Sequence, residues 1–199
     1  MTSTNKTSRP QLCAYLASRP GGDPAFSDMA RRTGRAVAES GADLVYGGGS
    51  SGLMGDIADA CLATGGRVTG VITEHLYDLE VAHQAVTELI VVGDMPERKR
   101  EMFERADGFL VLPGGIGTME ELFEVWCWAA LGLHPKALGL LNVNGFYDRL
   151  LEFMQRAASD GLMAPSTLEL LFVDDDPQRL VERVLHAVAA HHPSGTMSL

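Results

Sequence analysis

Short apolar runs alternate with longer amphipathic stretches along most of the 199-residue chain. Continuous apolar runs are typical of buried strands, whereas apolar residues spaced three and four apart are typical of helices. The predicted strands are Gln11–Ala17, Asp43–Tyr46, Arg67–Ile72, Glu88–Val92, Phe109–Leu112, Lys136–Val143 and Leu170–Val173. The predicted helices begin at Pro24 and near Ile57 and then cover Pro96–Ala106, Met119–Leu131, Phe146–Ser159 and Pro177–Ala190, whereas residues 73–84 show no regular period.

Strands that alternate with helices predict parallel βαβ units. We therefore expect an α/β fold, a single Rossmann-like doubly wound parallel sheet with helices on both faces. The domain is expected to cover residues 10–190, between flexible tails at 1–9 and 191–199. In such sheets the ligand crevice lies at the carboxyl ends of the strands. Two glycine-rich loops, residues 47–52 and 113–118, follow predicted strands at that edge.

The acidic composition excludes some classes of binding partner from those that we expect for such a domain. Acidic residues outnumber Lys and Arg by 26 to 16 and give a net charge of −10, so neither nucleic acid nor a membrane surface is an expected partner. The three cysteines are far apart and form no CxxC pair, which argues against a disulfide framework or structural zinc. His75 and His83 are too isolated for a metal site and are expected at the surface. The N-terminal segment has no apolar leader, so we expect a cytoplasmic protein. Because the histidines and cysteines are isolated, we expect no bound metal.

The segment Pro113–Thr118 carries the strongest chemical signal. Its three glycines allow close approach of a ligand to the backbone, and the following helix offers unpaired N–H groups and a positive dipole end to an anion. No Lys-Ser/Thr follows the last glycine and the spacing is not GxGxxG, so neither a Walker loop nor a dinucleotide fingerprint is expected. The alternative is a tight turn that needs glycine only for packing. The loop at 47–52 is either a second wall of the same site or a turn.

Charged residues flank the main loop. Glu120 and Glu121 begin the next helix, and because consecutive residues point about 100° apart, at most one is expected to face a ligand. Arg98 and Lys99 lie near the start of the preceding helix, where cations oppose the dipole and therefore either meet an anion or form a solvated face.

One helix also carries an apolar surface. Aromatic residues placed in this way form either core or a subunit interface, and Cys127 among them is expected to be a small buried residue without a reactive environment. The surface consists of Phe123, Trp126, Trp128 and Leu131.

These residues also form a recognisable pattern. Residues 113–121 match PGGxGTxxE, with Arg98-Lys99 upstream. The segments 46–55 and 139–147 match two further motifs. The chain thereby resembles the LOG (Lonely Guy) family of cytokinin-activating phosphoribohydrolases, called "lysine decarboxylase-like" in older usage. The resemblance implies hydrolysis of the N-glycosidic bond of a nucleoside 5′-monophosphate, either a cytokinin riboside 5′-monophosphate or AMP, to free base and ribose 5-phosphate. It implies no cofactor, and a homodimer or higher homo-oligomer with sites near the interface.

The resemblance also implies roles for individual residues. Glu121 would be the catalytic carboxylate and Arg98 its partner, which could hold Glu121 ionised and in position. The backbone of Gly114 to Thr118 and the Thr118 hydroxyl would hold the 5′-phosphate. The full set of implied substrate-binding residues is Gly48, Gly49, Glu80, Lys99, Gly114, Gly115, Ile116, Gly117, Thr118, Met119 and Glu120.

Three residues depart from the family pattern. Pro96 replaces a histidine, Cys127 stands where many members have threonine, and Arg19 lies where serine is common. These departures motivate an alternative hypothesis, a non-catalytic nucleotide-binding module. A pyridoxal-phosphate decarboxylase needs a lysine in the site. The chain has three lysines, of which Lys6 lies in the expected tail and Lys136 begins a predicted strand. Only Lys99 remains, so this activity is disfavoured.

Overall fold

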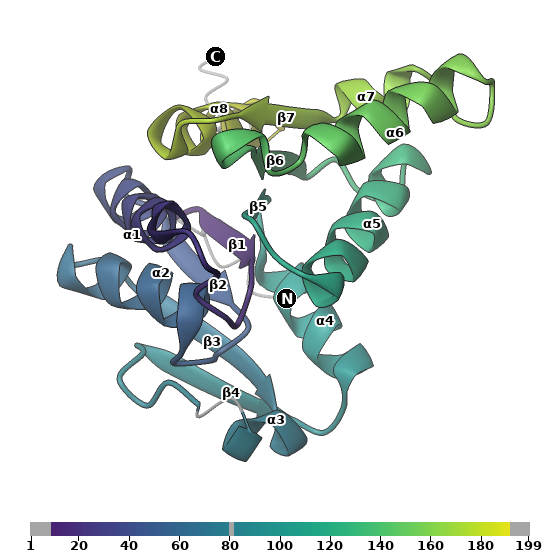
Figure 1. The fold of residues 1–199 in the computed structure, drawn as a ribbon. Helices are drawn as coiled ribbons and strands as arrows, with labels where there is room; N and C mark the ends of the chain where they lie inside the picture. The colour runs from purple at the N-terminus through teal and green to yellow at the C-terminus, as the bar shows by residue number, and fades with distance from the viewer. Residues whose placement is uncertain (1–8, 80–81, 192–199) are drawn as a thin grey trace, which may run out of the picture.

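The computed structural model describes residues 9–79 and 82–191, which form a seven-stranded parallel sheet with helices on both faces (Figure 1). The strand order is β4-β3-β2-β1-β5-β6-β7, and every neighbouring pair is parallel. The strands are β1 (Gln11–Tyr15), β2 (Asp43–Tyr46), β3 (Val68–Thr73), β4 (Glu88–Val92), β5 (Gly108–Val111), β6 (Ala137–Leu141) and β7 (Leu171–Asp174). The predicted fold class and all predicted strands are confirmed.

The helices follow the strands in chain order. They are α1 (Pro24–Glu39), α2 (Gly52–Ala63), α3 (Glu74–Leu79), α4 (Met95–Arg105), α5 (Ile116–Ala130), the 3-10 turn η1 (Val143–Gly145), α6 (Asp148–Ser159), α7 (Ser166–Glu169) and α8 (Pro177–His191). Two short helices, α3 and α7, were not expected from the sequence, because neither is long enough to show an amphipathic period. Most of the two expected tails lies outside the described residues, but Arg9 donates to the carbonyl oxygen of Gly41 and α8 includes His191.

Each face of the sheet has its own core layer. Side chains alternate along β1, so that Leu12 and Ala14 pack on one face and Cys13 and Tyr15 on the other. Helices α1, α2 and α8 cover the first face, and α4, α5 and α6 cover the second (Figure 1). Both faces of the five central strands are therefore buried, which explains why these strands are continuous apolar runs. The edge strand β4 is less covered, and its Val91 is 46% exposed.

The chain order places a topological switch point between β1 and β5. From β1 the chain builds outward through β2, β3 and β4, and from β5 it builds in the opposite direction through β6 and β7. The loops after β1 and β5 therefore separate at their carboxyl ends and leave a crevice. They are joined at its base, where the backbone N–H of Ala17 donates to the carbonyl oxygen of Pro113.

The start of α5 differs from the prediction. The helix begins at Ile116, three residues before the predicted Met119, and Gly115 is its N-cap. The three glycines made a loop through Thr118 the expected structure, because glycine has a low helix propensity. In the structure Gly115 is the N-cap and Gly117 lies in the first turn. Part of the expected glycine loop is thus the first turn of α5.

The apolar surface of α5 is divided between core and solvent. Trp126 is buried and donates its indole N–H to the carbonyl oxygen of Thr167, whereas Phe123 and Leu131 are exposed. Cys127 is exposed, so the expectation of a buried thiol was wrong. One residue along a helix turns the side chain by about 100°, which carries Cys127 from the buried face of Trp126 to the outside. Among the helices in residues 9–79 and 82–191, none combines the length and apolarity that a membrane span needs.

Close packing of α1 on α2 generates a testable prediction. A Cβ added at Gly34 would lie 2.2 Å from the carbonyl oxygen of Ile57, so Gly34→Ala must push two helices apart. We expect a loss of about 1–3 kcal/mol in the free energy of unfolding, although alanine is the better helix former. Urea denaturation measures the change, with Gly22→Ala as the control, because a Cβ there meets nothing within 4 Å. Equal stability of the two variants would contradict this packing.

Candidate active site

A cavity of about 680 Å³ lies at the carboxyl edge of the sheet, over the switch point. Its walls come from the loops after β1 and β5 and from the beginnings of α1, α2, α4 and α5. Its size is within the range of about 300–1,000 Å³ that is usual for small-molecule sites. The lining residues are Leu16, Ala17, Ser18, Arg19, Pro20, Gly21, Phe26, Leu53, Met54, Leu76, Met95, Arg98, Pro113, Gly114, Gly115, Ile116, Gly117, Thr118, Glu120, Glu121 and Phe146.

The segment from Gly114 to Thr118 forms one wall of this cavity. Thr118 is buried, and its side chain folds back over Gly114, where an added Cβ would lie 2.0 Å from the Thr118 hydroxyl oxygen. The glycine at 114 is therefore required by packing. The backbone N–H groups at the start of α5 have no partner within the helix, and the positive end of the helix dipole adds to them.

Gly115 and Gly117 have a different role. Neither has the positive φ that favours glycine, and a Cβ added at either would meet nothing within 4 Å. Both are exposed and both line the cavity. Packing alone does not require glycine at these two positions, so what they provide is open space beside the N–H groups of the helix. The arrangement favours an anion-binding cradle over a simple turn.

Two adjacent glutamates follow the cradle on α5. Both Glu120 and Glu121 line the cavity, whereas at most one was expected to face it. The Glu120 carboxylate is paired with the ammonium of Lys99, which also donates to Glu124 at 2.9 Å. Lys99 therefore bridges α4 to α5 and does not itself line the cavity.

Arg98 is the buried cation of the site. Its side chain comes from α4, and its residue is 4% exposed. Nε donates to the carbonyl oxygen of Val71 at 2.9 Å, and Nη2 donates to that of Gly47 at 2.8 Å. These bonds satisfy two donors of a charge that would otherwise be costly to bury, and they fix the guanidinium in the cavity wall.

The second glycine loop makes room for this arginine. A Cβ at Gly47 would lie 2.2 Å from Arg98 Nη2, and Gly48 has a φ of +78° and packs against Ile72. The backbone of Gly48 and Gly49 does not line the cavity and instead contacts the segment after α3, where the N–H of His83 donates to the carbonyl oxygen of Gly48. The loop thus supports the site from behind, and only the following residues, from Leu53, reach the cavity.

His83 is buried and was wrongly expected at the surface. Its Nε2 lies 3.0 Å from a carboxylate oxygen of Asp59, and its Nδ1 accepts from the N–H of Ala85. The partner lies on α2, which is 24 residues away in sequence, so no local pattern could have revealed the contact. His83 therefore anchors the segment after α3 to α2.

The charged residues of the site influence the pKa of two buried groups on β1. Burial raises the pKa of the Cys13 thiol, the nearby charge of Glu121 raises it further, and Arg98 opposes this effect. Burial likewise raises the pKa of the Tyr15 hydroxyl, with contributions from Cys13 and Glu121. Glu121 and Arg98 thus both act on the buried thiol of Cys13, in the middle of β1.

The remaining predicted residues are placed less directly. Met119 packs partly buried against the core layer under α5 and does not line the cavity. Glu80 lies outside the described residues. Sequence reasoning missed an apolar part of the wall, formed by Leu53, Met54, Leu76 and Met95. The apolar pair directly after the second glycine loop was the available signal for the first two of these.

The three departures from the family pattern leave the cavity intact. Pro96 sits in the first turn of α4, where a missing N–H costs little, and Asp94 caps the same helix by accepting from the N–H of Glu97 at 2.8 Å. Cys127 does not line the cavity, whereas Arg19 does. In the part of the chain that the structure describes, no group of three or more His, Cys, Asp and Glu could hold a metal.

The amino-acid sequence is similar to those of known proteins. A family model described as "Possible lysine decarboxylase" matches residues 54–184. A probable cytokinin riboside 5′-monophosphate phosphoribohydrolase of Oryza sativa subsp. japonica is 45% identical over 174 residues, which cover 87% of this chain and 77% of the relative. A cytokinin riboside 5′-monophosphate phosphoribohydrolase of Arabidopsis thaliana is 40% identical over 181 residues, which cover 91% and 85%.

Solved structures share the fold at lower identity. The molybdenum cofactor binding protein of Rippkaea orientalis matches with a TM-score of 0.69 at 18% identity, over 92% of this chain and 99% of that one. At this identity the likeness concerns the fold alone. The extent of the sequence matches, by contrast, shows that the chain belongs to the LOG family, which the model described as "Possible lysine decarboxylase" represents.

Proposed function

We propose that the chain hydrolyses the N-glycosidic bond of a nucleoside 5′-monophosphate and releases the free base and ribose 5-phosphate. The observation that carries the proposal is one cavity in which an anion cradle, a carboxylate and a buried arginine meet. The names of the relatives support the same reaction and point to a cytokinin riboside 5′-monophosphate as the substrate. AMP remains the other substrate that the family resemblance implies.

The 5′-phosphate binds at the start of α5. The backbone N–H groups there and the Thr118 hydroxyl are donors, and Gly115 and Gly117 leave the space for the phosphate oxygens. Binding this group away from the reacting bond supplies energy that holds the anomeric carbon in a reactive geometry.

Glu121 acts at the ribose. It stands one helical turn beyond Thr118 on the same helix and lines the same cavity. Loss of the base leaves positive charge on the sugar, which a carboxylate stabilises, and the same carboxylate can accept a proton from the attacking water. The oxygen of water bonds to C1′ while Glu121 takes one of its protons, and the C1′–N bond breaks. The leaving base takes up one proton from solvent, and Glu121 returns its proton to solvent.

Arg98 positions this chemistry and supplies the opposing charge. Its bonds to the carbonyl oxygens of Val71 and Gly47 hold the guanidinium fixed, so the positive charge does not have to be ordered when the substrate binds. The apolar residues Leu53, Met54 and Leu76 would bury a base or an apolar substituent on it, which supports N6-modified adenine beside adenine itself.

The alternatives gain no support from the cavity. The departures that motivated a non-catalytic module leave both Glu121 and Arg98 in its wall. For a decarboxylase, no lysine in residues 9–79 and 82–191 lines the cavity, since Lys99 is held by two glutamates and Lys136 Nζ lies 4.0 Å from the ring centre of Phe103.

We also infer a homo-oligomer. The outer side of α5 and the turn after it expose Phe123, Leu131 and Leu133, the last two at 68% each, and such residues are favoured in interfaces between subunits. Light scattering should give a multiple of 21.4 kDa, and Leu131→Glu should lower that mass toward the monomer. A monomer for the unaltered chain at micromolar concentration would contradict the inference.

Replacement of Glu121 tests the reaction itself. Glu121→Gln keeps the size of the side chain but removes its charge and basicity, so we expect base release to fall about 10²–10⁴-fold while nucleotide binding persists. Chromatography of free base from a panel of nucleoside 5′-monophosphates measures the rate, and calorimetry measures binding.

Glu124→Gln is the matched control, because Glu124 lies on the same helix, pairs with Lys99 and does not line the cavity. It should retain the rate of the unaltered protein within a few-fold. The proposal fails if the unaltered protein releases no base from any member of the panel, or if Glu121→Gln is as fast as its control.

Replacement of Gly47 tests the positioning of Arg98. The methyl group of Gly47→Ala would overlap Arg98 Nη2, so the guanidinium must move and kcat should fall at least about tenfold. Gly93→Ala adds the same methyl group with an ordinary contact at 3.5 Å and should have little effect.

A double-mutant cycle separates positioning from general damage. In an Arg98→Ala background, Gly47→Ala should cost little further activity, because the group that it displaces is already absent. Additive losses would show that Gly47 acts through something other than Arg98.

A further inference from the structure

Part of the cavity lining comes from elements other than those that carry Glu121 and Arg98. Glu121 and Arg98 come from α5 and α4, which cover one face of the sheet, whereas Phe26 comes from α1 on the other face. Phe146 follows β6, the neighbour of β5 on the far side of the switch point. Hydrolysis of a nucleoside monophosphate assigns no role to this part of the cavity, which we call the aromatic lobe and define by Arg19, Phe26 and Phe146.

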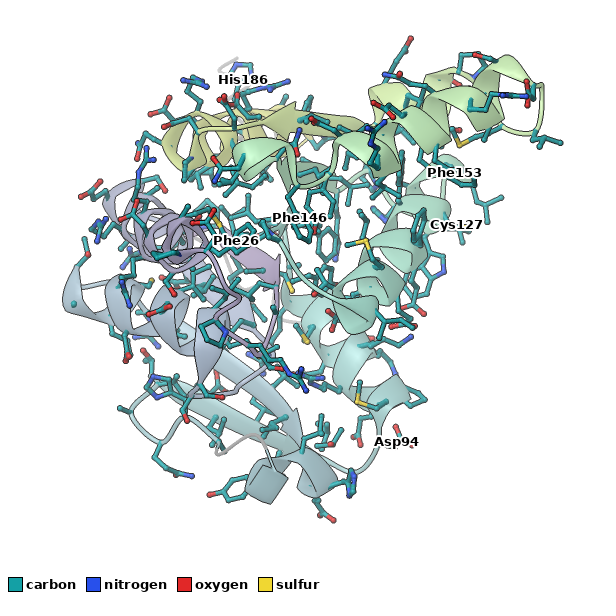
Figure 2. All side chains as sticks on the ribbon, viewed as in Figure 1. Phe26, Asp94, Cys127, Phe146, Phe153 and His186 are labelled. Atoms are coloured by element: carbon teal, nitrogen blue, oxygen red, sulfur yellow. The ribbon has the colours of Figure 1, made fainter. Side chains whose placement is uncertain are left out.

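The two rings of the aromatic lobe are held in place. Phe26 and Phe146 meet edge to face, with ring centres 5.6 Å apart, and Figure 2 shows them side by side. Phe146 also packs edge to face on Tyr147, whose hydroxyl donates to the carbonyl oxygen of Leu112 at 2.7 Å. Phe146 nevertheless remains 44% exposed as a residue. A fixed ring that is open to a cavity is suited to stack on a planar ligand.

The turn that carries Phe146 is fixed as well. Asn144 adopts a φ of +52°, which few residues other than glycine adopt. Its side-chain amide donates to the carboxylate of Asp23 at 3.2 Å, and Asp23 is the N-cap of α1. This contact joins the turn bearing Phe146 to the helix bearing Phe26, so the lobe has a defined shape without a ligand.

Arg19 adds a cation to the lining of the same cavity. It is exposed, lies in the loop between β1 and α1, and lines the cavity. Its side chain makes no ion pair or hydrogen bond within the described ranges 9–79 and 82–191. An arginine that lines the same cavity as the anion cradle, in a chain with a net charge of −10, is suited to bind a second phosphoryl group.

We propose that the aromatic lobe is a second subsite, which binds a phosphoryl group and a planar ring attached beyond the 5′-phosphate. The ligand class is two nucleosides joined by a 5′,5′-diphosphate. Arg19 binds the second phosphoryl group and the ring of Phe146 stacks on the second base. In doubly wound sheets, dinucleotides span the switch point with one half on each side, which matches the two parts of this cavity. The inference rests on the proposed function only for the first phosphate in the cradle.

The test compares three probes, AMP, ADP and P1,P2-di(adenosine-5′) diphosphate. Calorimetry is carried out with the unaltered protein and in a Glu121→Gln background, so that no probe is consumed in the second series. We expect the dinucleotide to bind at least tenfold more tightly than AMP, with ADP between them.

Variants assign the gain to the aromatic lobe. Phe146→Ala should weaken the dinucleotide about five- to hundredfold and Arg19→Ala should weaken both ADP and the dinucleotide about tenfold or more, while AMP changes less than about threefold. Phe146→Leu, which keeps an apolar side chain without the ring, guards against a folding defect and should also lose the preference.

Matched controls lie outside the cavity. Phe153→Ala removes an aromatic side chain from α6 (Figure 2), at a residue that is 65% exposed. Arg149→Ala removes an exposed arginine from the same helix. Both should leave all three affinities unchanged. Equal affinity for AMP and the dinucleotide, or a preference that survives both Arg19→Ala and Phe146→Leu, overturns the inference.

The outcome separates the inference from the proposed function. A protein that hydrolyses AMP but shows no preference for the dinucleotide refutes only the second subsite. A protein that releases no base but shows the preference and its loss in the variants refutes only the hydrolysis. Failure of the unaltered protein to bind any of the three probes refutes the second subsite.

Discussion

The buried guanidinium of Arg98 is the constraint on which the site depends. A charge removed from water needs donors and acceptors in fixed places, and Arg98 finds its acceptors in the carbonyl oxygens of Val71 and Gly47. These contacts join α4 to β3 and to the loop after β2. They also explain the glycine at 47, where a Cβ would collide with the guanidinium. The second glycine loop therefore serves the arginine rather than a ligand, and its neighbours Gly48 and Gly49 hold the segment after α3 in turn.

The switch point between β1 and β5 turns this local constraint into a site. Because the chain departs in opposite directions from these two strands, their loops leave a cavity that helices of both faces can reach. The helices of one face supply Arg98 and Glu121, the start of α5 supplies the cradle, and α1 supplies Phe26. The three glycines before and within the first turn of α5 have two different roles. Gly114 is required by the packing of Thr118, whereas Gly115 and Gly117 leave space for a ligand.

The apolar pattern was sufficient for the strands and the fold class, because a sheet buried on both faces requires continuous apolar runs. The pattern at Pro113–Thr118 correctly marked one wall of the cavity, and Glu121 and Arg98 line the same cavity. The features that the sequence did not reveal depended on contacts between distant residues or on backbone atoms. His83 is buried against Asp59, Lys99 is held by Glu120 and Glu124, and Arg98 binds carbonyl oxygens that every residue possesses. Phe26 and Phe146 meet although 120 positions separate them, and nothing in either local sequence marks the pair.

The dependence of hydrolysis on the 5′-phosphate tests the central claim most directly. If the cradle at the start of α5 holds that group while Glu121 acts at the ribose, the phosphate contributes binding energy to the transition state. The measurement is kcat/KM for base release from AMP and from adenosine by the same preparation. The account predicts equal amounts of adenine and ribose 5-phosphate from AMP, and a value for adenosine lower by about a hundredfold or more. Comparable values for the two substrates would contradict it.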